Sequence, residues 1–249
     1  PPSRSADRGE QAMKTFKVLS ILLSYPREGF REQSFALRQA LEAENLLSAS
    51  AREGIEGLIG TLAEADILDA EEAYCFLFDR TRSLSLHLFE HVHGESRDRG
   101  QAMVDLLELY RKAGFDVDAA ELPDYVPLFL EYLSLCPLEE ARALLAEPLH
   151  ILAALRARLE KRKSPYAAVF QALEELAGKQ AEAGKVEQIL ENEPDTDPTD
   201  PRALDQAWTE TEVRFGRDAG SEGCPKMKEI VETLKRETPG RASKRQESA

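Results

Sequence analysis

Two histidines are the side chains whose spacing in this sequence most directly suggests chemistry. His87 and His91 lie four residues apart, and on a helix this spacing places two imidazoles on one face, as in zinc sites. Glu90 or His93 would then complete a metal site, and the chain would be a helical metal-binding enzyme that uses the histidines with a carboxylate. The alternative is that the histidines are hydrogen-bonded at a helix edge or belong to a binding rim. We favour this alternative, because no cysteine accompanies them and a further ligand would have to come from elsewhere in the chain.

Other signatures of an active site are missing from the sequence. It contains no G-x-S-x-G motif, no P-loop and no G-x-G-x-x-G motif. Cys75 lies among Tyr74, Phe76 and Leu77, so we expect it to be buried packing material rather than a nucleophile. Carboxylates are plentiful, but on amphipathic helices most of them form solvated faces. We therefore predict that the protein is not an enzyme.

The charge of the chain indicates which kinds of partner it attracts. Its 249 residues hold 32 Lys and Arg against 46 Asp and Glu, a net charge of −14. This charge repels nucleic acids and anionic membranes and attracts a basic protein or peptide. The three cysteines form no C-x-x-C pair, and the apolar run 18–23 is too short for a signal-peptide core or a membrane span. We expect a protein of the reducing cytoplasm, without direct membrane insertion.

The elements that must position these residues are expected to be helices. Apolar residues recur at helical spacing along most of the chain, and the alternation typical of strands is almost absent. We count about ten helices between residues 16 and 177, which predicts an all-α fold, a single compact helical bundle. One helix is expected over residues 83–93, and another, apolar nearly all round, over residues 123–135. The expected N-cap residues are Asp69, Asp98, Asp124 and Ser164, and another helix is expected to begin near Ser48.

Composition divides the chain into three parts. Residues 1–12 are polar and are interpreted as an N-terminal extension or a cloning remnant, whereas residues 13–178 are expected to form the helical domain. Residues 179–249 are expected to be an acidic, largely disordered C-terminal tail, because residues 190–212 hold eight acidic residues against one basic residue. Within the tail, residues 203–215 keep enough apolar side chains to form a short segment that docks back on the domain.

Two polar stretches have more than one interpretation. The run Glu95–Gly100 is either a loop whose charges pair with one another, or a rim beside an apolar groove in which Arg97 and Arg99 hold carboxylates in place for a partner. Further along, Asp124 is expected to cap the helix that follows it. Glu121 would then be free to meet a basic group on a bound peptide.

Three stretches together form a recognisable pattern. They are Tyr74-x-x-Leu77-Phe78-Asp79-Arg80, then Leu88-Phe89-Glu90-His91-Val92-His93-Gly94-Glu95-Ser96-Arg97-Asp98-Arg99-Gly100-Gln101-Ala102-Met103, then Glu121-Leu122-Pro123-Asp124-Tyr125 with Leu130-Glu131-Tyr132-Leu133. Over residues 16–177 the chain closely resembles the NarJ-type nitrate reductase molybdenum cofactor assembly chaperones, the "delta subunit" proteins related to TorD and DmsD. One departure is Tyr125, which stands where that family usually has His after its acidic-Pro-Asp motif. A tyrosine at position 125 can still pack or form hydrogen bonds, but it cannot perform a role that needs a titrating imidazole.

The resemblance implies a TorD-like chaperone fold and a dedicated cytoplasmic chaperone rather than a subunit of the finished enzyme. Such proteins bind the N-terminal segment of the apo catalytic (alpha) subunit of membrane-bound respiratory nitrate reductase. They hold it soluble before it docks at the membrane and promote insertion of the molybdenum–bis(guanine dinucleotide) cofactor, binding no cofactor permanently themselves. The oligomeric state stays open between a monomer and a weak homodimer. A scaffold subunit that remains in the mature complex is a further alternative.

A peptide-binding groove between helices needs apolar walls and, for a basic peptide, carboxylates at its edge. The expected apolar and aromatic contacts are Leu106, Tyr110, Tyr125, Leu128 and Tyr132. The expected acceptors of positive charge are Glu90, Glu95, Glu121 and Asp124. The other candidates for this peptide-binding site are Asp79, His87, His91, Arg97, Arg99 and Met103.

Overall fold

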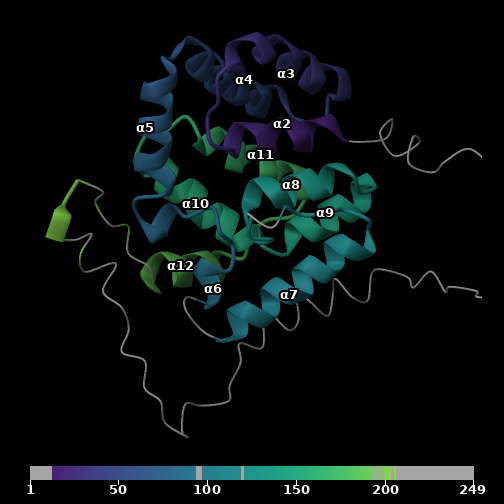
Figure 1. Cartoon of the computed structure of the whole chain (residues 1–249), viewed down its shortest axis with the longest axis vertical. Coiled ribbons are helices and arrows are strands. Elements are labelled where there is room, and N and C mark those ends of the chain that lie inside the picture. The colour runs from purple at the N-terminus through teal and green to yellow at the C-terminus, as the bar shows by residue number, and fades with distance from the viewer. Residues whose placement is uncertain are drawn as a thin grey trace, which may run out of the picture.

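The computed structural model describes residues 13–93, 97–118, 121–192, 195, 197, 199–202 and 205. Within that part of the chain the regular structure consists of eleven α-helices and one 3-10 helix, with no strand, which confirms the predicted all-α fold (Figure 1). The elements are α2 (Lys14–Leu23), α3 (Phe30–Glu44), α4 (Ala49–Glu64), α5 (Ile67–Phe78), η1 (Arg82–Leu84), α6 (Glu90–His93), α7 (Arg97–Lys112), α8 (Val126–Ser134), α9 (Leu138–Ala146), α10 (Leu149–Lys161), α11 (Ala167–Ala177) and α12 (Ala183–Asn192).

The helices pack around one apolar core. In Figure 1 α2, α3 and α4 lie at the top, α8 to α11 fill the middle, and α7 lies along the lower edge. Helix α2 packs against α3 and α8, α4 packs against α11, and α10 packs against α11. Phe16 on α2, Leu130 on α8 and Phe170 on α11 are completely buried in this core. Burying such side chains is the main stabilising contribution to the bundle.

Helices α4 and α11 approach closely at a glycine. A Cβ atom placed on Gly54 would lie 2.9 Å from the Cβ of Ala168, which is shorter than any normal contact. Gly57, one turn further along the same helix, faces open space. The glycine at position 54 is therefore needed for the packing of α4 on α11, whereas the one at position 57 is not.

The predicted helix start near Ser48 is confirmed for α4, whereas the N-caps predicted at Asp69 for α5 and at Ser164 for α11 are wrong. Helix α11 begins at Ala167, after the N-cap residue Tyr166. The side chain of Ser48 accepts a hydrogen bond from the backbone N–H of Ala51 at 3.2 Å. Helix α5 is capped by Asp66, which accepts from the N–H of Leu68 at 2.9 Å, so Asp69 lies inside the first turn. The earlier start adds one turn to the helix, and the N–H of Ala70, the first buried residue of α5, bonds to the carbonyl of Asp66 at 3.0 Å.

The single helix predicted over residues 83–93 is wrong. The chain instead forms η1, an extended stretch, and the four-residue helix α6. The extended stretch pairs with a distant segment: the N–H of Leu88 donates to the carbonyl of Asp124 at 3.1 Å, and the N–H of Val126 donates to the carbonyl of Leu86 at 2.9 Å. An isolated antiparallel bridge between His87 and Tyr125 lies at the centre of this pairing. The alternation Ser-Leu-Ser-Leu-His-Leu from residue 83 is the two-residue period of an extended chain.

Two further cap predictions are also wrong. Helix α7 begins at Arg97, so Asp98 lies within its first turn, where a negative charge is favourable next to the helix N-terminus. Helix α8 begins at Val126, and its N-cap residue, Tyr125, makes no side-chain capping bond. Asp124 lies one position too early to cap α8, and its carboxylate bonds elsewhere.

Helix α12 lies in the segment that the sequence analysis assigned to the tail. It packs against α10, where the buried guanidinium of Arg158 donates to the carbonyls of Ser83, at 2.6 Å, and Ile189, at 3.2 Å. The guanidinium of Arg162 adds a bond of 2.5 Å to Asp195. The packed structure therefore continues past residue 178. Residues 1–12, and residues 203–215 apart from position 205, lie outside the described residues.

Candidate functional site

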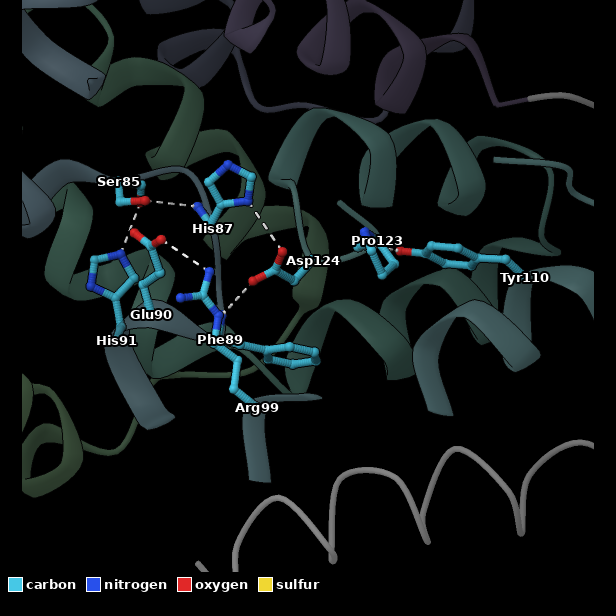
Figure 2. Close-up of polar contacts among 9 residues, drawn as sticks. All are labelled: Ser85, His87, Phe89, Glu90, His91, Arg99, Tyr110, Pro123 and Asp124. Carbon is cyan, nitrogen blue, oxygen red and sulfur yellow. Dashed lines mark hydrogen bonds and ion pairs between the residues drawn. The ribbon is translucent and has the colours of Figure 1, made fainter. Parts of the chain in front are cut away.

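Two segments from the motif-rich part of the sequence meet side by side. Residues 86–89 run against residues 124–126 through the backbone bonds given above, and Asp124 lies at the junction (Figure 2). Its carboxylate is fully buried, with one oxygen 3.1 Å from Nδ1 of His87 and the other accepting the N–H of Phe89 at 3.0 Å. A buried carboxylate needs such partners, because an unpaired one would be strongly destabilising. Asp124 therefore holds the two segments together and cannot receive a charge from a bound peptide.

The partner of this carboxylate is an unusually basic histidine. Burial lowers the pKa of His87, but the hydrogen bond to Asp124 and the attraction of its negative charge outweigh that effect and raise the pKa above its ordinary value. The ring of His87 also lies 5.3 Å from the ring of Tyr125, centroid to centroid. His87 thus joins a buried anion to an aromatic side chain at the edge of the junction.

Neighbouring polar residues of the motif also hold the chain together. Arg99 on α7 pairs with Glu90 on α6 at 3.0 Å. Nε2 of His91 lies 2.8 Å from the carbonyl oxygen of Ser85, and the hydroxyl of Tyr110 donates to the carbonyl of Pro123 at 2.8 Å. Figure 2 shows these side chains bridging α6, α7 and the loop before α8. These contacts join separate segments of the chain, and we call the cluster, together with His87 and Asp124, the structural lock.

The geometry removes the basis of the metal-site hypothesis. His87 lies in the extended stretch before α6 and His91 lies within α6, so they do not share a helix face. Each imidazole has a partner of its own, Asp124 and the carbonyl of Ser85. Among the residues that the structure describes, no three His, Cys, Asp or Glu side chains gather in a way that would hold a metal ion. The alternative of a helical metalloenzyme is not supported.

Three of the five predicted apolar contacts are core residues. Tyr110 is 0% exposed, Tyr132 2% and Leu106 6%, and the two tyrosine rings pack together at 4.8 Å. They therefore do not line an open groove. Of the remaining candidates, Met103 is half-buried against the core and Asp79 is exposed at the end of α5. Glu95 and the side chain of Arg97 lie outside the described part of the chain.

The other three candidates, Glu121, Tyr125 and Leu128, line a cavity of about 820 Å³. Its wall also includes the loop between α2 and α3, the α4–α5 connection, and the loop after α7. Sequence reasoning missed three aromatic side chains of the wall: Tyr25 from the loop after α2, Phe30 at the start of α3, and Phe115 from the loop after α7. The available signal was that each of these aromatic residues is next to a Pro or Gly, residue types that mark turns and helix ends.

The cavity wall is predominantly negative. Of the described residues that line it, six are acidic and two are basic. The acidic ones are Glu28, Glu32, Asp116, Asp118, Glu121 and Glu131, and the basic ones are Arg27 and Arg31. Like charges around a concave surface reinforce one another and attract ligands of opposite sign. The cavity therefore combines aromatic walls with a negative edge.

Tyr125 connects the cavity to the structural lock. It lines the cavity, while its ring lies against His87 and its hydroxyl lies 2.9 Å from the hydroxyl of Tyr74. Tyr74 is buried and donates to the carbonyl of Leu23 at 2.8 Å, at the end of α2. The packing and hydrogen-bonding role expected for position 125 is what the structure shows. None of the described helices has the length and apolar character needed to cross a bilayer.

Comparisons with known proteins agree with the family resemblance that the motifs indicate. The family model described as "Nitrate reductase delta subunit" matches residues 29–172. The chain is 42% identical over 203 residues to the nitrate reductase molybdenum cofactor assembly chaperone NarJ of Escherichia coli K12, covering 82% of this chain and 85% of that protein. It is 41% identical over 208 residues to the probable assembly chaperone NarW of the same strain, covering 83% and 85%. A probable NarJ chaperone of Bacillus subtilis is 31% identical over 159 residues, covering 64% and 85%. These matches show that the chain belongs to the nitrate reductase delta subunit family.

Proposed function

We propose that this chain is a dedicated chaperone for the catalytic molybdenum subunit of a respiratory nitrate reductase, and that it binds the N-terminal segment of that subunit. In this proposal it acts in the cytoplasm, keeps the apo-subunit soluble before membrane docking, and promotes insertion of the molybdenum–bis(guanine dinucleotide) cofactor without keeping a cofactor itself. Support comes from its relatives, which are named as molybdenum cofactor assembly chaperones and not as enzymes.

The single observation that carries the proposal is the cavity between α2, α3 and α8. Its volume of about 820 Å³ accommodates several side chains of a peptide. Its lining lies within the matched family region apart from residues 20–28, which belong to the end of α2 and the loop after it. Aromatic walls suit an apolar stripe on the peptide, while the excess of carboxylates suits basic residues beside that stripe. A basic, amphipathic peptide is the ligand that this chemistry fits.

Calorimetry with a synthetic peptide of the client's N-terminal segment tests the binding. The wild-type chain should bind, and Glu121→Ala should weaken binding because it removes a carboxylate from the wall. Arg27→Gln is the matched control of opposite charge. It removes a positive charge from the same wall and should strengthen binding of a basic peptide. Both effects should shrink as salt rises, since screening at 0.1 M acts over about 10 Å. If neither variant changes the affinity, the cavity is not the peptide site.

Co-purification tests the partner directly. The chain should capture the catalytic subunit from cells, and deletion of the subunit's N-terminal segment should abolish capture. Gel filtration of the mature reductase separates a chaperone from a resident scaffold subunit, because a chaperone should be absent from the finished enzyme. Gel filtration of the chain alone distinguishes a monomer from a weak homodimer.

A further inference from the structure

Tyr125 lines the cavity, and the contact of its hydroxyl group with Tyr74 shows which partner donates the proton of their shared hydrogen bond. Tyr74 and Tyr125 are joined through their hydroxyl oxygens at 2.9 Å, and the hydroxyl of Tyr74 also lies 2.8 Å from the carbonyl oxygen of Leu23. Each phenol has one proton to donate, and a carbonyl oxygen can only accept. The proton of Tyr74 is therefore used for Leu23, and the bond between the two tyrosines requires Tyr125 to be its donor.

This assignment leaves Tyr125 with lone pairs but no proton to offer. Burial raises the pKa of Tyr125 above its ordinary value, so the phenol keeps its proton at neutral pH and can supply this bond. Among the contacts that the described residues make, the hydroxyl oxygen of Tyr125 accepts none. Tyr125 is half-buried and lines the cavity. Its oxygen is thus an acceptor on a partly desolvated wall, where an unmade hydrogen bond is costly.

We infer that Tyr125 is a specificity-determining residue, whose hydroxyl oxygen accepts a hydrogen bond from a lysine or arginine side chain of the bound peptide. This inference rests on the proposed function and adds to it the chemistry of one client side chain. A cation is favoured over a neutral donor because the same wall carries six carboxylates against two guanidinium groups. The methylene groups of a lysine or arginine side chain could also pack on aromatic rings of the same wall, such as those of Tyr25 and Phe30.

A pair of near-isosteric variants isolates the oxygen of Tyr125. Tyr125→Phe removes that oxygen and the bond to Tyr74. Tyr74→Phe removes the same bond from the other side but leaves the oxygen of Tyr125 able to accept. Both variants lose the tyrosine–tyrosine bond, and Tyr74→Phe also loses the bond to the carbonyl of Leu23. A larger loss of peptide affinity in Tyr125→Phe than in Tyr74→Phe therefore belongs to the oxygen at position 125.

The probe is a synthetic peptide of the client's N-terminal segment, with each lysine and arginine replaced in turn by methionine. Calorimetry should show that Tyr125→Phe weakens binding of the parent peptide about tenfold, the size expected for one hydrogen bond from a charged donor. Tyr74→Phe should stay within about twofold of wild type, since its acceptor at position 125 remains. Replacing one particular cation should weaken wild-type binding by the same factor and should leave Tyr125→Phe unaffected. This peptide arm also tests the inference on the wild-type chain if a protein variant is too unstable to measure.

Different failures have different meanings. If the parent peptide binds the wild type and Tyr125→Phe binds equally well, the inference is wrong while the proposed function stands. An equal loss for every peptide, with no cation coupled to position 125, also overturns the inference, because it would indicate a backbone donor or altered packing. If the parent peptide does not bind the wild type at all, the proposed function fails, and the inference fails with it.

Discussion

Replacing Asp124 should separate the structural lock from the peptide site. The carboxylate is fully buried and has two partners, Nδ1 of His87 at 3.1 Å and the N–H of Phe89 at 3.0 Å. Asp124→Ala removes both bonds at once. It leaves the N–H of Phe89 without its acceptor inside the bundle and His87 without its counter-charge.

The expected magnitude follows from these contacts. Hydrogen bonds to a charged group contribute about 1.5–3 kcal/mol each, and breaking a buried charged pair costs about 3–5 kcal/mol. The side chain of His87 is 30% exposed, so water replaces part of what it loses. We therefore expect Asp124→Ala to lower the free energy of unfolding by about 3 kcal/mol, the low end of that range. Asp124→Asn keeps an acceptor for Phe89 but not the charge, so its loss should be about half as large.

Urea unfolding followed by far-ultraviolet circular dichroism measures these changes, and thermal melting checks them. For a chain of this size a loss of about 3 kcal/mol corresponds to a decrease in Tm of about 6–12 °C. Glu121→Ala is the matched control, since Glu121 is exposed on the same loop and its removal should change stability by less than about 0.5 kcal/mol. Asp124→Ala should therefore impair stability, and Glu121→Ala should impair peptide binding. If Asp124→Ala is as stable as Glu121→Ala, the buried carboxylate does not hold the two segments together.

The remaining predictions concern the lock at His87 and the approach at Gly54. Because the pKa of His87 is raised in the folded state above its ordinary 6.5, its protonated form stabilises the fold fully below pH 6.5, and this contribution is lost as pH rises through the folded pKa. The stability difference between wild type and His87→Gln should thus be largest at pH 6 and shrink toward pH 8.5; a constant difference in urea midpoint across this range would contradict the assignment. Gly54→Ala should destabilise the bundle by about 1–3 kcal/mol, because its methyl group would lie 2.9 Å from the Cβ of Ala168. Gly57→Ala on the same helix meets nothing within 4 Å and should instead stabilise by about 0.5–1 kcal/mol, so equal effects of the two substitutions in thermal melts would refute the close approach.

Helical periodicity predicted most of the bundle because its information is local. The spacing of Phe16, Leu19 and Leu23 marks the buried face of α2. The hydroxyl of Ser48 caps α4 by accepting the N–H of Ala51, three residues further along. These features depend on residues within one or two turns, which a single sequence displays directly. Gly178, which ends α11 with a φ of 64°, is another example.

The lock and the cavity could not be predicted in the same way, because both are built from distant segments. Asp124 has the residue type of a helix cap and lies close to the start of α8, yet its partners lie 35 and 37 residues earlier in the chain. His87 and His91 have the spacing of a helical pair, but pairing with residues 124–126 extends the backbone between them. The loop at Tyr25 and the loop at Phe115 line the same cavity, and no local sequence pattern predicts that these two segments come together.

The contacts of Arg158 and Arg162 have a consequence for how much of this chain can be trimmed. Arg158 is 2% exposed, and one of its hydrogen-bond acceptors, the carbonyl of Ile189, belongs to α12. Arg162 bonds to Asp195, still further along. A version shortened to residue 178 would take these acceptors away from two cations on α10, one of them deep in the interior. The smallest self-sufficient unit of this protein therefore reaches at least to Asp195, which already lies within the acidic stretch of residues 190–212.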